Sequence, residues 1–157
     1  MRMPTFHPPC LEAEPMDLRQ ATADDVPAMF EIRIAVRESH MTLEALAREG
    51  VTPASVTAYL EEQMRGWVVS CDDRIVGFSL ADGETRSVWA VFVLPEFEGR
   101  GGGRLLLAAA TEWLLPSGSG PIRLVTKEGT RAEAFYLKAG WKQEHVNTAG
   151  DVVFTYG

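Results

Sequence analysis

A glycine cluster between two apolar segments is the feature that most constrains this chain. Residues 87–93 read SVWAVFV, which is typical of a strand in the centre of a sheet, and residues 104–115 have helical character. Between them, residues 98–104 read EGRGGGR, with four glycines and two arginines. Glycine lets a ligand approach the backbone, and the start of a helix offers free N–H groups and partial positive charge. The order of strand, glycine loop and helix therefore predicts an anion site suited to phosphate.

Two familiar phosphate-binding loops do not fit this spacing. A Walker loop ends in Gly-Lys-Ser/Thr, whereas Gly103 is followed by Arg104 and Leu105. A dinucleotide loop needs G-x-G-x-x-G, but the sixth position counted from Gly99 is Arg104. No acidic residue follows at the ~20-residue distance that this motif requires. The loop must therefore bind another kind of phosphate, or serve only as a turn.

The remaining patterns predict a mixed α/β sheet covered by helices. Asp72 and Asp73 separate two apolar runs and indicate a hairpin, while Thr52 followed by Pro53 indicates a helix start. Segment 38–50 is ambiguous. The expected order is a strand at 17–20, helices at 22–37 and 53–64, the hairpin within 67–81, a strand at 87–93, a helix at 104–115, a strand at 121–126, a helix at 130–139 and two strands within 141–157. Gly66 is expected to end the second helix, and Thr130 with Glu133 to form a capping box.

Length and composition indicate one domain. The chain has 157 residues, 46% of them hydrophobic, which is enough for a single core. We expect residues 1–16, with four prolines, to form a flexible extension and residues 17–157 to form the domain. The fold class expected is therefore a single α/β domain.

The net charge limits the kinds of partner to expect, and the cysteine content indicates the cellular compartment. A net charge of -7 is opposite to that of a nucleic-acid binder, so a neutral or cationic partner is expected. Cys10 and Cys71 do not make a disulfide framework, and no metal-ligand spacing occurs, so we expect a reducing compartment and no metal. No apolar run approaches the ~18 residues that span a bilayer, and no signal peptide is evident. We therefore expect a cytoplasmic protein without a membrane partner.

A second segment, AFYLKAGW at 134–141, specifies the family that the chain resembles. A helix carrying an aromatic pair and ending at Gly140 follows the glycine loop by about thirty residues. Together the two segments resemble the GNAT superfamily of acyl-CoA-dependent N-acetyltransferases, whose loop reads Gln/Arg-x-x-Gly-x-Gly/Ala. Gly101 and Gly103 match its small positions, and Glu98 departs from its Gln or Arg. The resemblance implies a mostly antiparallel, twisted sheet of about seven strands, splayed between strands 4 and 5 and flanked by about four helices.

The resemblance also implies acetyl-CoA as co-substrate and assigns residues to it. The strand backbone at Val91, Phe92 and Val93 would line the pantetheine arm, and an N–H of Phe92 or Val93 would polarise the thioester carbonyl. Tyr136 would protonate the departing thiolate as general acid, although a helical aromatic residue is also compatible with simple core packing. The pyrophosphate would be held by the loop residues Glu98, Gly99, Arg100, Gly101, Gly102, Gly103 and Arg104.

The base and the acceptor site are less well specified. Many relatives carry a glutamate on the fourth strand, where this chain has SVWA at 87–90. Glu84, just before that strand, is a weak candidate for the base, as are Glu38 and His40 between the first two helices. Glu38 and His40 are candidates for substrate binding, and with Glu44 and Glu49 they favour a cationic amine. A small primary amine is expected as acceptor, with a protein or peptide amine as the alternative.

Two other functions remain open at this point. A domain that binds or senses acyl-CoA without catalysis is compatible with the missing strand-4 glutamate. A GNAT toxin acting on aminoacyl-tRNA is disfavoured by the net charge of -7. The resemblance also allows a homodimer, because closed symmetric pairs are the usual soluble assembly. Acyl-chain preference and the identity of the amine are not specified by the sequence.

Overall fold

The computed structural model describes residues 16–36 and 42–157. Glu38, His40 and Cys10 therefore lie outside the described residues. The described residues form one seven-stranded sheet with the order β1-β2-β3-β4-β5-β7-β6. All neighbouring strands are antiparallel except β4 and β5, which are parallel. The strands are β1 (Asp17–Gln20), β2 (Met64–Cys71), β3 (Arg74–Asp82), β4 (Ser87–Val93), β5 (Ile122–Lys127), β6 (Lys142–Val146) and β7 (Asp151–Tyr156).

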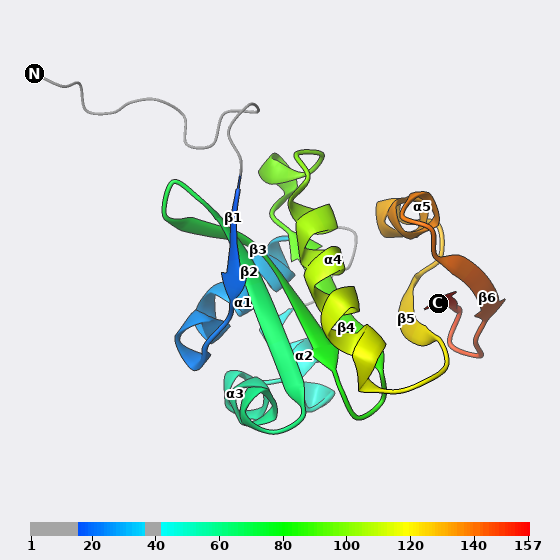
Figure 1. The fold of residues 1–157 in the computed structure, drawn as a ribbon. Helices are drawn as coiled ribbons and strands as arrows, with labels where there is room; N and C mark the ends of the chain where they lie inside the picture. The colour runs from blue at the N-terminus through cyan, green and yellow to red at the C-terminus, as the bar shows by residue number, and fades with distance from the viewer. Residues whose placement is uncertain (1–15, 37–41) are drawn as a thin grey trace, which may run out of the picture.

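Five α-helices accompany this sheet within the described part of the chain, one more than expected. They are α1 (Val26–Ala35), α2 (Leu43–Arg48), α3 (Pro53–Glu61), α4 (Gly102–Leu114) and α5 (Arg131–Lys138). The additional helix, α2, lies in the segment that the sequence left ambiguous. Helices α1 and α3 contact β3 and β2, and α4 contacts β2, β3 and β4. Figure 1 shows α4 running between the β1–β4 part of the sheet and the group formed by β5, α5 and β6.

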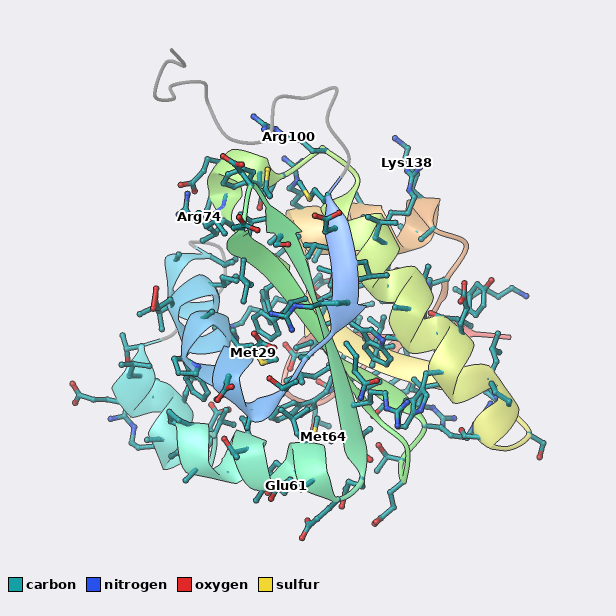
Figure 2. All side chains as sticks on the ribbon, turned by 60° about the vertical axis from the view of Figure 1, so that its left-hand side comes forward. Met29, Glu61, Met64, Arg74, Arg100 and Lys138 are labelled. Carbon is teal, nitrogen blue, oxygen red and sulfur yellow. The ribbon has the colours of Figure 1, made fainter. Side chains whose placement is uncertain are left out.

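Two buried apolar clusters lie in these two halves of the sheet. The first gathers side chains from α1, α2, α3, β2 and β3, including Met29, which Figure 2 shows in the interior beside α1. The second gathers side chains from α4, β5, α5 and β7, including Phe154. Val91 and Trp67 pack against both clusters. The sheet is therefore held by two cores that meet at β4.

The sheet opens between β4 and β5. One residue pair, Ser87 and Arg123 at the start of both strands, is in register there. A bulge places Trp89 as an extra residue of β4 opposite β3, between the pairs Ala81–Val88 and Leu80–Ala90. Among the residues that the structure describes, none pairs with the β5-facing edge of β4 beyond Ser87. The expected splay between strands 4 and 5 is thus confirmed.

Most predicted elements are confirmed, but three local predictions are wrong. Helix α3 ends at Glu61, and Gly66 lies inside β2, where a Cβ atom would stand 2.9 Å from Leu80 Cδ2. Gly66 therefore permits close packing against β3 rather than ending a helix. The predicted capping box at α5 also does not form. The Thr130 hydroxyl donates to the Lys127 carbonyl, and the Glu133 carboxylate accepts from the Gly129 N–H.

The third correction concerns the cysteines. Cys71, at the end of β2, is buried and disulfide-bonded. This bond was not predicted from the sequence, which shows no disulfide framework and indicated a reducing compartment. Met16, the last residue of the expected extension, belongs to the first buried cluster.

An ion pair fixes the start of α1. The Arg19 guanidinium donates to both carboxylate oxygens of Asp25 at 2.8 Å, and the Thr22 N–H donates to the same carboxylate. The hydrogen bonds from Arg19 lower the pKa of Asp25 below its usual value. Because Asp25 is buried, this pairing ties β1 to the beginning of the helix that carries Arg33 into the cavity described below.

Arg86 holds the closed end of the splay. Its guanidinium donates to the carbonyls of Leu114 and Gly120, both at 2.7 Å, and to the Ser117 hydroxyl at 3.0 Å. Its own carbonyl accepts from the Arg123 N–H. The Arg86 side chain thus binds the end of α4 and the following loop, while its backbone carbonyl, directly before β4, binds the start of β5. The backbone of Arg86 has a φ of 53°, a value that residues other than glycine rarely adopt.

We expect Arg86→Ala to lower the free energy of unfolding by about 2–3 kcal/mol, because the charge-assisted hydrogen bonds to the Leu114 and Gly120 carbonyls are lost. Urea unfolding measures this change. Arg123→Ala is the matched control, since its contact with Glu144 is 4.0 Å long and exposed and should contribute less than about 1 kcal/mol. Equal losses for the two variants would contradict the role assigned to Arg86.

Candidate active site

A cavity of about 810 Å³ occupies the region where β4 and β5 diverge. This volume lies within the roughly 300–1,000 Å³ that ligand pockets occupy. It has two sides, on either side of β4. The α1–α3 side is lined by Met29, Phe30, Arg33, Leu46, Glu49 and Val56. The loop–α5 side is lined by Gly99, Gly101, Gly103, Arg104, Arg131 and Tyr136. Residues 89–93 of β4 line the cavity between them.

The glycine loop has the geometry of an anion site. Gly99 and Gly101 have φ values of 79° and 90°, which explains the need for glycine at both positions. Gly101 caps α4, and the first helical hydrogen bond runs from the Leu105 N–H to the Gly101 carbonyl. The N–H groups of Gly102, Gly103 and Arg104 therefore have no acceptor within the helix. These N–H groups and the positive end of the helix dipole both favour an anion at the rim of the cavity.

Two predicted loop residues are not in the cavity lining. Gly102 is buried, and a Cβ atom there would stand 2.8 Å from Met16 Sδ, so this glycine allows the N-terminal part of the domain to pack against α4. The guanidinium of Arg100 lies 5.3 Å from the centre of the Phe97 ring. Figure 2 shows Arg100 and Lys138 projecting at the same end of the molecule. The Arg100 side chain thus lies on the exposed surface of the loop, and its part in binding the pyrophosphate stays a prediction.

Glu98, the departure from the family pattern, faces a cation. Its carboxylate lies 3.6 Å from Arg131 Nη1 at the start of α5, and both side chains are partly exposed. The contact bridges the glycine loop and α5 across the opening of the sheet. Glu98 and Arg131 both line the cavity. The sequence did not indicate this pairing, because the two residues are far apart in the chain.

The exposed edge of β4 carries backbone donors toward the cavity. The Leu94 N–H donates to the Val76 carbonyl of β3. In an antiparallel ladder alternate residues bond to the same neighbour, so the Phe92 N–H is directed to β3 and the N–H groups of Val91 and Val93 face the splay. Of the two donors that the sequence left open, Val93 is therefore the one that the register favours.

Tyr136 lies at the floor of the loop–α5 side. Its side chain is 6% exposed and packs against Phe135, Trp141 and Phe154, with ring centres 5.2–6.2 Å away. The residue nevertheless lines the cavity. Burial raises the pKa of the Tyr136 phenol above its usual value. The phenol is therefore protonated at neutral pH, and the residue combines core packing with a proton that could be donated.

Glu84 is not brought to this cavity. It lies in the exposed turn between β3 and β4, where its N–H donates to the Asp82 carboxylate at 2.9 Å. It is absent from the residues that line the cavity. The acidic residues that do line it are Glu49, Glu98 and Asp151. Glu49 is the one on the α1–α3 side, and it was noted in the sequence only as part of an acidic segment.

Arg33 is the residue that sequence reasoning most clearly missed. From the sequence it was assigned no role in a site. In the structure its guanidinium lies 4.4 Å from the centre of the Phe92 ring and lines the cavity. Trp89, which is 43% exposed, lines the same side. The only available signal was a cation at a position whose helical neighbours, Met29 and Phe30, face the core.

Two further observations concern membranes and metals. No helix in the described part of the chain is long and apolar enough to cross a bilayer. Among residues 16–36 and 42–157, no group of three His, Cys, Asp or Glu side chains is placed to hold a metal ion.

Comparisons with solved structures reveal the same architecture in several acetyltransferases. The PaiA N-acetyltransferase from Thermoplasma acidophilum, solved with coenzyme A, superposes with a TM-score of 0.76 at 16% identity, covering 90% of this chain and 98% of that chain. A GCN5-related N-acetyltransferase from Rhodopseudomonas palustris gives 0.74 at 21% identity, covering 92% and 96%. The ribosomal-protein-S18-alanine N-acetyltransferase from Escherichia coli gives 0.68 at 14%, covering 89% and 92%. At these identities the likeness shows the fold.

The sequence comparisons add the family. No protein with a curated description matches this chain in sequence. The family model described as "Acetyltransferase (GNAT) domain" matches residues 62–143, which extend from just before β2 to the beginning of β6. This match covers more than half of the chain and includes both the glycine loop and Tyr136. The chain therefore belongs to the GNAT acetyltransferase family.

Proposed function

We propose that this protein transfers an acetyl group from acetyl-CoA to a primary amine by direct attack. The observation that carries the proposal is the single cavity with two sides, which meets the glycine loop at one end and α1–α3 at the other. A cavity that reaches both sides of β4 allows the two substrates to be bound together. Direct attack then needs no covalent intermediate on the protein.

The loop–α5 side fits a CoA molecule. The free N–H groups at the start of α4 suit its pyrophosphate, and the cations Arg104 and Arg131 line the same side. The pantetheine arm would lie along the unpaired edge of β4. Acetyl-CoA would supply an activated acyl group, a thioester whose carbonyl is open to nucleophiles. The chain's own contribution is to orient this group and to stabilise charge on the carbonyl oxygen.

The Val93 N–H is the proposed donor to that oxygen. A preorganised backbone donor aimed at a developing oxyanion contributes about 3–4 kcal/mol in comparable sites. Tyr136 is the proposed general acid, because its hydroxyl belongs to a protonated phenol in the cavity lining. The proton of the amine would leave through water or through Glu49, since Glu84 lies outside the lining.

Thiol release from acetyl-CoA in the presence of a panel of primary amines tests the proposal. We expect Tyr136→Phe to lower kcat by about 100- to 10,000-fold, because the departing thiolate loses its proton donor. The thermal midpoint should change little, since the aromatic contacts remain. Tyr156→Phe is the matched control: Tyr156 stacks on Trp141 outside the cavity lining, and its loss should leave kcat unchanged.

Full activity in Tyr136→Phe would remove the general acid from the proposal but leave acetyl transfer in place. Acetyl-CoA binding without release of thiol for any amine would instead favour a domain that senses acyl-CoA.

Glu98 should weaken CoA binding in the wild-type protein. Its carboxylate lies at the phosphate end of the cavity and occupies Arg131. We expect Glu98→Gln to lower the dissociation constant for CoA severalfold at low ionic strength, since a negative charge that repels the phosphates is removed from this end of the cavity. Isothermal titration measures the change. Glu133→Gln, at a partly exposed position two residues after Arg131 in α5, is the control for a general charge effect. Weaker binding by Glu98→Gln would show that the ion pair organises the loop instead.

A further inference from the structure

Arg33 places a fixed cation on the α1–α3 side of the cavity. Its guanidinium stacks on Phe92, the residue before Val93 in β4. The position on α1 is set by the helix, whose buried residues Met29 and Phe30 line the same side. Stacking limits the directions in which the guanidinium can move, so its donors remain near the edge of β4. A cation held in this way is prepared to bind an anion beside the reacting centre.

The surroundings of Arg33 strengthen its interaction with an incoming anion. Burial lowers the pKa of the guanidinium below its ordinary value, while the nearby Glu49 acts in the opposite direction. The group stays charged at neutral pH, because arginine keeps its proton in proteins. Charges that are partly removed from water interact more strongly with a partner than charges on an open surface. An anionic group on the acceptor would therefore be attracted here.

The other cations of the cavity are on the opposite side. Arg104, Lys127, Arg131 and Lys138 come from the glycine loop, β5 and α5, where the CoA phosphates are expected. Among the described lining residues, Arg33 and Glu49 are the charged side chains contributed by the α1–α3 side. Around them lie apolar side chains, including Val56 and the exposed Trp89. This side thus combines one cation, one anion and an apolar wall.

We propose that the acceptor is an amine that also carries a carboxylate and an apolar body, as a hydrophobic amino acid does, and that Arg33 binds the carboxylate. The inference rests on the proposed function, since it names the substrate class of the same cavity. Glu49 attracts the ammonium form of the same molecule, and the apolar wall contacts its side chain. The proposal adds a carboxylate to the expected cationic amine, which the acidic residues of segment 38–50 and the overall negative charge favoured.

The test compares phenylalanine with phenylalanine amide, which share a body and an amine but differ in the carboxylate. The amines of the two compounds differ in pKa, and this difference affects wild type and variant equally. The readout is therefore the ratio of kcat/KM for the acid to kcat/KM for the amide, compared between wild type and variant. We expect Arg33→Met to lower the ratio of acid to amide by about 10- to 100-fold, mainly through KM, because a charge-assisted contact is lost. Arg33→Lys should restore part of it. The Arg33→Met protein must still bind CoA as the wild type does.

Glu49→Gln is the matched control on the same side of the cavity. It should lower kcat/KM for both amines, because the attraction for their ammonium group is lost. The ratio of acid to amide should stay unchanged or rise, because the repulsion of the carboxylate is lost as well. If Arg33→Met lowers kcat/KM for both amines equally, Arg33 is a packing residue and the inference is wrong. A wild-type protein that binds the amide as well as the acid at a pH above both amine pKa values would also overturn it.

Binding provides a readout that does not need turnover. N-acetylphenylalanine and its amide are titrated into the CoA-saturated protein, and we expect the acid to bind at least tenfold more tightly in wild type but not in Arg33→Met. Equal affinities, or no binding of either, would overturn the inference while the proposed function stands, provided that some other amine is acetylated. If no amine is acetylated and acetyl-CoA does not bind, the proposed function itself fails.

Discussion

The interruption of pairing between β4 and β5 is the constraint on which the site depends. Parallel strands at the centre of a sheet usually exchange hydrogen bonds along their length, yet these two are in register at Ser87 and Arg123 alone. The lost pairing leaves the backbone donors of β4 facing open space, which costs stability unless a ligand or water satisfies them. The two buried apolar clusters and the hydrogen bonds of Arg86 hold the strands in this arrangement. The fold is thus stabilised around an opening rather than around a closed sheet.

The opening also explains the exposure of β4. Its continuous apolar sequence predicted a central strand, and β4 is indeed fourth of seven. However, most of its side chains are only partly buried, because those at 89–93 line the cavity. A sequence rule that equates a continuous apolar run with complete burial cannot distinguish a buried strand from one that lines a ligand cavity. Here the glycine loop directly after the strand was the additional signal.

Most features encoded by nearby residues were predictable, with the capping box at α5 as the exception, and features created by contacts between distant residues were not. The Asp72–Asp73 hairpin, the Thr52 cap, the glycine loop and Gly140 after α5 all depend on local backbone preferences, and the structure has each of them. Gly66 was assigned wrongly because its role depends on Leu80 in the neighbouring strand. The Arg33–Phe92 stack and the Glu98–Arg131 pair likewise follow from the register and from the position of α5. Glu84, the predicted base, lies outside the cavity lining, because proximity to β4 along the chain does not fix the position of a side chain in space.

The central claim is that the opening between β4 and β5 binds a CoA thioester, and the most direct measurement is the melting temperature with acetyl-CoA, CoA, ATP and NAD in parallel. A ligand at ~100 times its dissociation constant adds about 2.7 kcal/mol to the stability of the folded state. For a domain of this length that corresponds to a rise of roughly 5–10 °C. We expect this rise with acetyl-CoA and CoA and a smaller one or none with ATP and NAD. An equal rise with ATP or NAD, or no rise with either CoA compound, would contradict the claim.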